Sequence, residues 1–264
     1  MATKTTSSKL IVYRGFLGTN NYVWSPFVNK LEIRLRLTGL PYRVEPGSMR
    51  QAPRSKVPYL GFEGSDELLA DTTLIIRKFV EDGTFSDLNA GLTPVQKAQD
   101  LAIRSLLEDK LYFYLVRERW IDNFYTMRPG ALAAMPYFLQ LIIGNLAYNG
   151  TLRTLYGQGT GRYTKDEVRQ FKLEIWENLN VLLSESRNSS SAAKRDRHTP
   201  FWVLGRPEPS EADATVYAFI VASLVCTAAP ETQKTVRTFP VLVDYAKRVH
   251  NTYYSDYDIW EDQV

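Results

Sequence analysis

Three short motifs in the first third of the chain carry side chains whose types and spacing could act on a ligand. They are Ser25-Pro26, Lys56-Val57-Pro58 and Asp71-Thr72. Each motif also has an ordinary structural explanation, because Ser-Pro and Asp-Thr both suit the start of a helix, and proline suits the entrance of a strand. Their order along the chain favours a functional interpretation, since all three follow a short apolar run at residues 9–13 that predicts a strand.

The first 82 residues alternate between strand and helix patterns. Phe27, Leu31 and Leu35 recur every four residues and predict a helix that starts near Ser25 and stops at Gly39. Four more elements are expected in this region, three strands and one helix. They cover residues 42–45, 57–62, 67–70 and 72–81.

The remainder of the chain is predicted to be helical. Residues 83–92 are rich in Gly, Asn and Asp and predict a linker. Three helix-start signals follow, at Thr93-Pro94-Val95-Gln96, Thr164-Lys165-Asp166-Glu167 and Ser210-Glu211-Ala212-Asp213. A last amphipathic helix is expected at 240–249, and the polar stretch 186–199 predicts an exposed, mobile loop. We therefore expect a disordered tail at 1–8, an α/β domain at 9–82 and an all-α domain at 93–264.

Composition excludes several classes of protein. Hydrophobic content of 44% and aromatic content of 12% favour a packed core, and a net charge of +3 is too small for nucleic-acid binding. The single cysteine, Cys226, excludes an intramolecular disulfide and favours a reducing, cytoplasmic location. No membrane span is expected, because the longest apolar stretch, 214–229, contains polar residues and is shorter than the ~20 residues a bilayer needs. His198 and His250 are far apart in sequence, so we expect both to be exposed and no metal site.

Together, the motifs resemble those of the glutathione transferase superfamily. This resemblance implies a thioredoxin-like N-terminal domain followed by an all-helical C-terminal domain. Residues 201–205 followed by the signal at Ser210 resemble the helix-capping signature of the second domain in that family. The long loop before Ser25, the Lys30-Leu31-Glu32 segment and the segment 70–76 are most similar to the failed-axon-connections and metaxin-like branch, which includes fungal and bacterial glutathione enzymes, some associated with secondary metabolism.

The resemblance implies a role for each motif. Ser25 would donate a hydrogen bond to the sulfur of glutathione and lower the thiol pKa by roughly one to two units from ~8.5, because a hydrogen bond to a charged group contributes roughly 1.5–3 kcal/mol. Tyr13 and Tyr22 are alternative donors to the sulfur. A cis Val57–Pro58 bond would turn the Val57 backbone toward the cysteinyl part of glutathione. The other binding residues would be Lys56 at the glycine carboxylate, Asp71 and Thr72 at the γ-glutamyl end, and Trp24 beside Ser25.

Aromatic residues on or after the first helix of the second domain are expected to line a pocket for an apolar electrophile. With Tyr22, the candidates are Tyr112, Phe113, Arg117 and Trp120.

Two classes of function follow. The first is a homodimeric, glutathione-dependent enzyme that conjugates the thiol to a small apolar electrophile or isomerises a double bond by reversible thiol addition. The second is a non-catalytic adaptor that keeps the fold for protein contacts. Disulfide exchange is excluded at this site, because Ser25 and Val28 replace both cysteines of the Cys-Pro-Phe-Cys pattern. The residue types do not identify the electrophile, nor do they separate conjugation from isomerisation.

Overall fold

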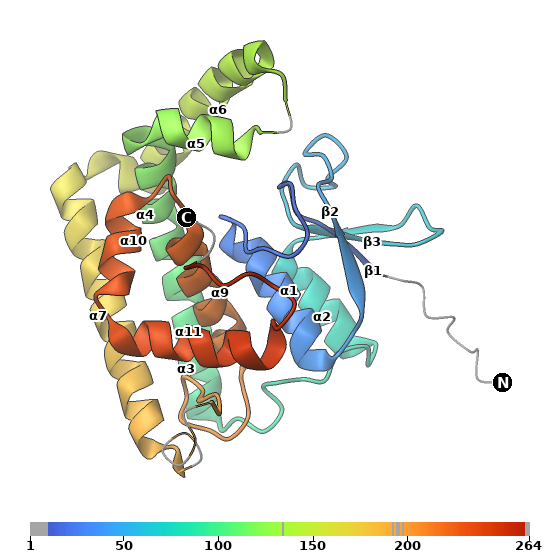
Figure 1. Cartoon of the computed structure of the whole chain (residues 1–264), viewed down its shortest axis with the longest axis vertical. Coiled ribbons are helices and arrows are strands. Elements are labelled where there is room, and N and C mark those ends of the chain that lie inside the picture. The colour runs from blue at the N-terminus through green and yellow to red at the C-terminus, as the bar shows by residue number, and fades with distance from the viewer. Residues whose placement is uncertain (1–9, 134, 192, 194–195, 197, 262–264) are drawn as a thin grey trace.

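A computed structural model describes residues 10–133, 135–191, 193, 196 and 198–261, so the predicted tail at 1–8 lies outside the described residues. Figure 1 shows a small sheet with two helices on one side of the molecule and a bundle of helices on the other. This is the predicted architecture, a thioredoxin-like domain followed by a helical domain.

The N-terminal domain is a mixed four-stranded sheet in the order β2-β1-β3-β4. Strand β1 pairs parallel with β2 and antiparallel with β3, and β3 pairs antiparallel with β4. The strands are β1 Leu10–Tyr13, β2 Tyr42–Glu45, β3 Tyr59–Phe62 and β4 Leu68–Ala70. The helices are α1 Pro26–Thr38 and α2 Thr72–Glu81. The predicted α2 agrees with the structure at both ends, and Gly39 ends α1 with φ +72°.

Helices α1 and α2 cover the same face of the sheet. Alternate strand residues point toward that face, where Val12 and Leu60 pack against Leu31 of α1 and Ile75 and Phe79 of α2. Burial of this cluster fixes α1 on the sheet, and so fixes the place where α1 begins.

The second domain is helical throughout its regular structure. Its first helix runs without a break from residue 94 to residue 122 and contains two π-helical turns. The elements are α3 Pro94–Ser105, η1 Leu106–Leu111, α4 Tyr112–Arg117, η2 Glu118–Asp122, α5 Phe124–Ala131, α6 Tyr137–Gln158, η3 Thr160–Arg162, α7 Lys165–Ser189, α9 Glu211–Val225, α10 Pro230–Arg237 and α11 Pro240–Tyr253. All residues of α9 are buried, and this helix packs against α1 of the first domain.

All three predicted helix starts are confirmed as capping boxes. The hydroxyls of Thr93 and Thr164 accept the amide at the third helical position, and the Ser210 carbonyl accepts that of Asp213 at 3.1 Å. In return, the side chains of Gln96, Glu167 and Asp213 accept from the backbone amides of the three caps. Asp213 also accepts hydrogen bonds from the Val203 amide at 2.7 Å and from the Tyr245 hydroxyl at 3.1 Å. Burial nevertheless raises the pKa of Asp213 to about 6.

The prediction of an exposed, mobile loop at 186–199 is wrong in part. Helix α7 continues through Ser189, because its buried stripe extends from Leu179 and Leu183 to Ser186. The Ser186 hydroxyl donates to the Val203 carbonyl at 2.9 Å. Farther along, the buried Arg248 donates to the carbonyls of residues 193, 196 and 199.

Within the described residues, no single helix is long and apolar enough to cross a membrane. Helices α9 and α10 meet the length and composition criteria only as a pair bent by 117°.

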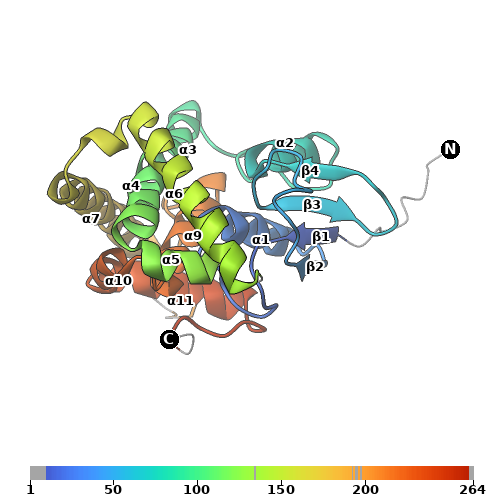
Figure 2. The same ribbon diagram turned by 90° about the horizontal axis from the view of Figure 1, so that it is seen from above.

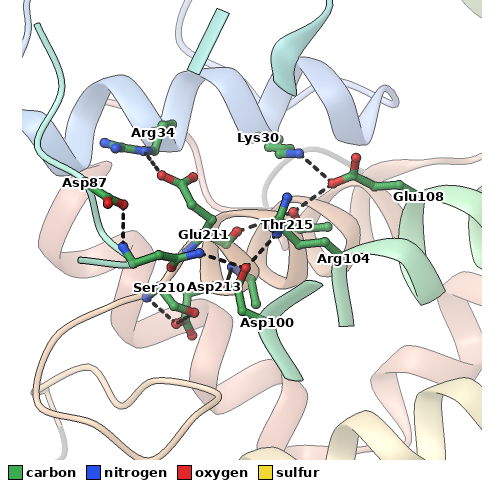
Figure 3. Close-up of polar contacts among 12 residues, drawn as sticks. Lys30, Arg34, Asp87, Asp100, Arg104, Glu108, Ser210, Glu211, Asp213 and Thr215 are labelled. Carbon is green, nitrogen blue, oxygen red and sulfur yellow. Dashed lines mark hydrogen bonds and ion pairs between the residues drawn. The ribbon is translucent and has the colours of Figure 1, made fainter. Parts of the chain in front are cut away.

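Two cations of α1 meet carboxylates of the helical domain across the interface between the domains (Figure 3). Lys30 contacts Glu108 at 2.6 Å, and Arg34 contacts Glu211 at 2.8 Å. Glu108 also accepts from the Thr215 hydroxyl at 2.9 Å. Because the cations are buried and one helical turn apart, the two ion pairs define the register of α1 against the second domain.

Candidate functional site

The register of the sheet brings the three sequence motifs to the same end of its strands. Tyr13 pairs with Tyr59, and Tyr59 pairs with Ala70. The loop to Ser25 leaves from Tyr13, Val57-Pro58 directly precedes Tyr59, and Asp71-Thr72 directly follows Ala70. The three segments therefore start from adjacent positions of three neighbouring strands.

Ser25 is the N-cap of α1. Its Oγ accepts a hydrogen bond from the Val28 amide at 3.4 Å, and its backbone is extended. The cap uses a lone pair of the hydroxyl oxygen and leaves the hydroxyl proton to be donated elsewhere. A half-buried O–H donor thus lies at the positive end of a 13-residue helix, a position that favours an anion.

The bond between Val57 and Pro58 is cis, as the resemblance implied. Gly15 packs so closely on Val57 that a Cβ at Gly15 would lie 2.9 Å from the Val57 Cγ2. Gly15 has φ +73°, so this position needs glycine for both its backbone and its contact. Lys56, next to Val57, is exposed.

Asp71 is the N-cap of α2 in an unusual backbone conformation, with φ +75° and ψ +114°. Its Oδ1 accepts from the amides of Thr73 and Leu74 at 3.1 and 3.2 Å. Asp71 itself is exposed, whereas Thr72 is buried. A non-glycine residue at such φ costs on the order of 1–3 kcal/mol, and such residues cluster at active sites and ligand sites.

Trp24 connects the site to the helical domain. Its carbonyl accepts from Arg119 Nη1 at 2.7 Å, and its side chain packs with Trp120 on the cluster that contains Met127. The Trp24 indole lies directly over Gly130 of α5, where an added Cβ would be 2.1 Å from a ring carbon. Arg119 and Gly130 are not among the residues predicted from the sequence, where the local signal is limited to a Pro129-Gly130 pair inside a helical segment.

One predicted pocket residue, Tyr112, contacts the first turn of α1, and Phe113 lies beside it. The ring of Tyr112 meets Phe27 of α1 at a centroid distance of 4.9 Å and Phe113 at 5.5 Å. Arg117 points elsewhere, because its guanidinium donates to the carbonyls of Tyr163 at 2.5 Å and Thr160 at 3.4 Å.

Tyr22 lies in a buried aromatic cluster and is 2% exposed. Its hydroxyl is 2.6 Å from the Tyr217 hydroxyl and 2.7 Å from His250 Nδ1, and burial raises the pKa of Tyr22 well above its usual value. Tyr22 is therefore enclosed in the core and does not face the candidate site. The prediction that His250 is exposed is wrong: it is 7% exposed, and burial lowers its pKa.

Tyr13 lies on the other side of the sheet from α1. Its ring stacks on Tyr59 at 4.4 Å, and strand alternation places it opposite Val12, which packs under the helices. Burial raises the pKa of Tyr13. Of the three candidate thiolate donors, only Ser25 combines a half-buried hydroxyl with a helix N-terminus.

Contacts from the first domain and from the C-terminal segment fix the loop from Arg14 to Trp24. The Arg14 guanidinium donates to the carbonyls of Gly18, Thr19 and Asn21, and it forms a fully buried ion pair with Glu32 at 2.9 Å. From the C-terminal segment, the Tyr257 hydroxyl donates to Glu32 at 3.1 Å and the backbone amide of residue 258 donates to the carbonyl of residue 20 at 3.0 Å.

A cavity of about 490 Å³ lies near the other end of α1, lined by residues that include Arg36, Gly39 and Tyr257. It is separated from Ser25 by the length of α1, roughly 20 Å at 1.5 Å per residue. Arg36 in its wall forms an ion pair with Asp256 at 2.5 Å. The cavity is therefore separate from the candidate site.

Comparisons with known proteins agree with the fold. Residues 26–125 match the family described as glutathione S-transferase N-terminal domain. The isoprene-epoxide–glutathione S-transferase of Rhodococcus sp. (strain AD45) is 26% identical over 242 residues, which cover 87% of this chain and 92% of that protein.

Solved structures of low sequence identity share the fold. Glutathione transferase GSTFuA2 from Phanerochaete chrysosporium superposes with a TM-score of 0.59 at 12% identity, covering 93% of this chain and 98% of its own. Ure2p in complex with glutathione gives 0.55 at 11% identity, with 94% and 91% covered. The chain is thus similar to this family over residues 26–125 and shares the fold of these structures, while the failed-axon-connections and metaxin-like branch stays a prediction.

Proposed function

We propose that this protein is a glutathione transferase that conjugates the glutathione thiol to a small apolar electrophile. The main support is the position of Ser25 at the N-terminus of α1, at the end of the sheet where the cis Val57–Pro58 bond and Asp71 also lie. The fold and the relative from Rhodococcus add to this support.

In the proposed reaction, Ser25 donates its hydroxyl proton as a hydrogen bond to the glutathione sulfur. A hydrogen bond to a charged acceptor contributes roughly 1.5–3 kcal/mol, which lowers the thiol pKa by roughly one to two units. The N-terminus of α1 favours the thiolate in the same direction. The Val28 amide holds the Ser25 oxygen in place while the proton faces the ligand.

The remaining motifs bind the peptide part of glutathione in this proposal. The Val57 backbone pairs with the cysteinyl residue, and the exposed Lys56 meets the glycine carboxylate. Asp71 accepts a hydrogen bond from the γ-glutamyl ammonium. Its helix-capping bonds use Oδ1, so Oδ2 still has acceptor sites. Thr72 contributes its amide to the γ-glutamyl carboxylate at the start of α2.

The electrophile binds against Phe27, Tyr112 and Phe113, at the junction of the two domains. A small apolar epoxide is the first substrate to test, because the relative from Rhodococcus is an isoprene-epoxide–glutathione S-transferase. The sulfur would bond to one epoxide carbon while the carbon–oxygen bond breaks, and the alkoxide would take a proton from water.

Calorimetric titration with reduced glutathione tests the ligand and its place. We expect binding to the wild type, a large loss in Asp71→Ala and no loss in Asp66→Ala, an exposed aspartate in the turn between β3 and β4. Circular dichroism controls for the lost helix cap of Asp71→Ala. If the folded wild type gives no binding heat, the adaptor function takes the place of the transferase.

Product analysis with a small epoxide tests the reaction. We expect a stoichiometric glutathione adduct, and we expect Ser25→Ala to lose most turnover while it still binds glutathione. Turnover unchanged in Ser25→Ala would remove Ser25 from the mechanism. An isomerase would instead convert an alkene substrate without consuming glutathione.

A further inference from the structure

Arg119 is a buried cation with two N–H groups that have no partner in the described part of the chain. It lies in η2 and is 4% exposed. Its Nη1 donates to the Trp24 carbonyl at 2.7 Å, whereas Nε and Nη2 are buried and unpartnered. The adjacent carboxylate, Glu118, binds Lys172 and the backbone amides of residues 231 and 232 instead. A buried charge without a counter-charge is costly, and an anion bound beside it would offset that cost.

The two unpartnered groups form one edge of the guanidinium. Nε–H and one Nη2–H point in the same direction, and such a fork binds an oxyanion through two hydrogen bonds. Nη1 lies outside this fork, so the bond to the Trp24 carbonyl leaves the fork free. Arginine does not lose its proton in proteins, so the fork can donate hydrogen bonds to an anion but cannot protonate it.

The surroundings of Arg119 are apolar and adjoin the proposed electrophile site. Trp24 packs on the buried apolar cluster that contains Cys226. Burial raises the pKa of Tyr112, and the charge of Arg119 opposes this rise, so the guanidinium acts on the same ring that contacts Phe27. Helix α5 contacts η2, and η1 of the same long helix contacts α9, which packs on α1 (Figure 2). Where water is excluded in this way, a cation stabilises a nearby anion more strongly than it does in water.

Ring opening of an epoxide produces such an anion. As the glutathione sulfur bonds to one epoxide carbon, the carbon–oxygen bond breaks and its electron pair stays on the oxygen. Water then protonates this alkoxide, which replaces the proton that the thiol lost to solvent when the thiolate formed. Because the charge on the oxygen develops in the transition state, donors placed around it lower the barrier.

From these observations we propose that Arg119 is a catalytic residue for epoxide substrates, whose Nε–H and Nη2–H donate to the ring oxygen as it becomes an alkoxide. The assignment rests on the proposed function. It adds a substrate preference, for epoxides over electrophiles that release a weakly basic leaving group.

Two electrophiles of equal chain length test this role. We would compare kcat/KM for 1,2-epoxybutane, which forms an alkoxide, with kcat/KM for 1-iodobutane, which releases iodide, a poor hydrogen-bond acceptor. Arg119→Gln should lose on the order of 100-fold with the epoxide, as is typical when an oxyanion donor is removed, and far less with the iodide. Arg119→Lys keeps a charged donor and should recover part of the epoxide rate. A purely structural role through Trp24 would instead lower both rates by the same factor.

The matched control is Arg248→Gln. Arg248 is similarly buried, at 6% exposed, and it also donates to backbone carbonyls, those of residues 193, 196 and 199. It lies on α11 and contacts none of the site residues described above. The control should leave the ratio of the two rates unchanged, whatever its effect on thermal stability.

Binding of two glutathione derivatives to the wild type tests the same contact without a substitution. S-(carboxymethyl)glutathione has a carboxylate oxygen three bonds from sulfur, as the alkoxide is in the opened epoxide, and S-(carbamoylmethyl)glutathione is its neutral isostere. A charge-assisted hydrogen bond is roughly twice as strong as a neutral one. We therefore expect calorimetry to show at least about fivefold tighter binding of the carboxylate, and loss of this preference in Arg119→Gln.

The outcomes separate this assignment from the proposed function. Equal losses with both electrophiles in Arg119→Gln, or no preference of the wild type for the carboxylate, would overturn the role of Arg119 and leave the transferase in place. If Arg119→Gln does not fold, the binding comparison on the wild type decides. A wild type that conjugates neither electrophile would overturn the proposed function, and the role of Arg119 with it.

Discussion

Replacing Gly130 with alanine should move Trp24 and so disturb the site without touching it directly. In the present packing, the new Cβ would lie 2.1 Å from Cη2 of Trp24 and 2.4 Å from Cζ3. Carbon atoms in contact are ~3.5 Å apart, so the indole or α5 must shift by more than about 1 Å. Trp24 precedes Ser25 directly, and Arg119 holds its carbonyl.

The expected loss in stability is smaller than the expected loss in activity. Overpacking costs about 1–3 kcal/mol, and replacing a helical glycine with alanine returns about 1 kcal/mol, so the net destabilisation of Gly130→Ala is about 0–2 kcal/mol. A displacement of about 1 Å near a reacting group can lower the rate on the order of 100-fold. We therefore expect the free-energy loss calculated from the fall in kcat/KM to exceed the loss in the free energy of unfolding.

The assay compares thermal unfolding and kcat/KM for glutathione conjugation in Gly130→Ala and in Gly150→Ala. Gly150 is also helical, but a Cβ there would meet nothing within 4 Å. The control should be as stable as the wild type or more stable, with unchanged kcat/KM. Equal kinetics in the two variants would refute the coupling of α5 to Ser25 through Trp24.

Three further predictions concern the contacts that support α1. Lys30→Met should destabilise the protein by about 3 kcal/mol in urea unfolding, because Glu108 loses its buried cation, and Glu108→Gln in the same chain should restore part of this loss; equal stability of Lys30→Met and wild type would contradict it. Tyr257→Phe should cost about 1.5–3 kcal/mol in thermal unfolding, because a buried hydrogen bond to a carboxylate is lost, and an unchanged Tm would contradict it. Burial raises the pKa of Glu32 to about 6 from 4.5, so the folded chain binds this proton more tightly than the unfolded chain. Glu32 should therefore add up to about 2 kcal/mol of stability as the pH falls from 6 to 4.5 and none of it above pH 6; Glu32→Gln should lack this gain in denaturant titrations, and an equal pH dependence in both proteins would contradict the assignment.

The sequence was most informative where the structural signal is local. The ends of α2 and the starts of α3, α7 and α9 follow from residues within one turn of each end, and the structure confirms them. The cis bond before Pro58 was expected from its neighbours in the same way.

Contacts between distant parts of the chain were not predictable in this way. Tyr22 is buried because its partners Tyr217 and His250 lie 195 and 228 residues away, so no local pattern predicts its burial or that of His250. Likewise, the sequence predicted Trp24 at a ligand site but not its close packing on Gly130. That contact depends on how α5 is oriented against the indole. Helix α7 continues through Ser186 because a distant carbonyl, that of Val203, accepts its hydroxyl proton.

The contacts of the loop before Ser25 have a consequence for biosynthesis. Glu32, the ion-pair partner of Arg14, accepts a hydrogen bond from Tyr257, which the ribosome adds 225 residues later. At about 5–20 residues per second, this delay is roughly 10–45 s. A nascent chain can complete its sheet during that interval, but it lacks the last contacts that hold the Ser25 loop until the C-terminal segment emerges. Synthesis of the segment around Tyr257, rather than folding of the first domain, therefore sets the earliest time at which this site can be complete.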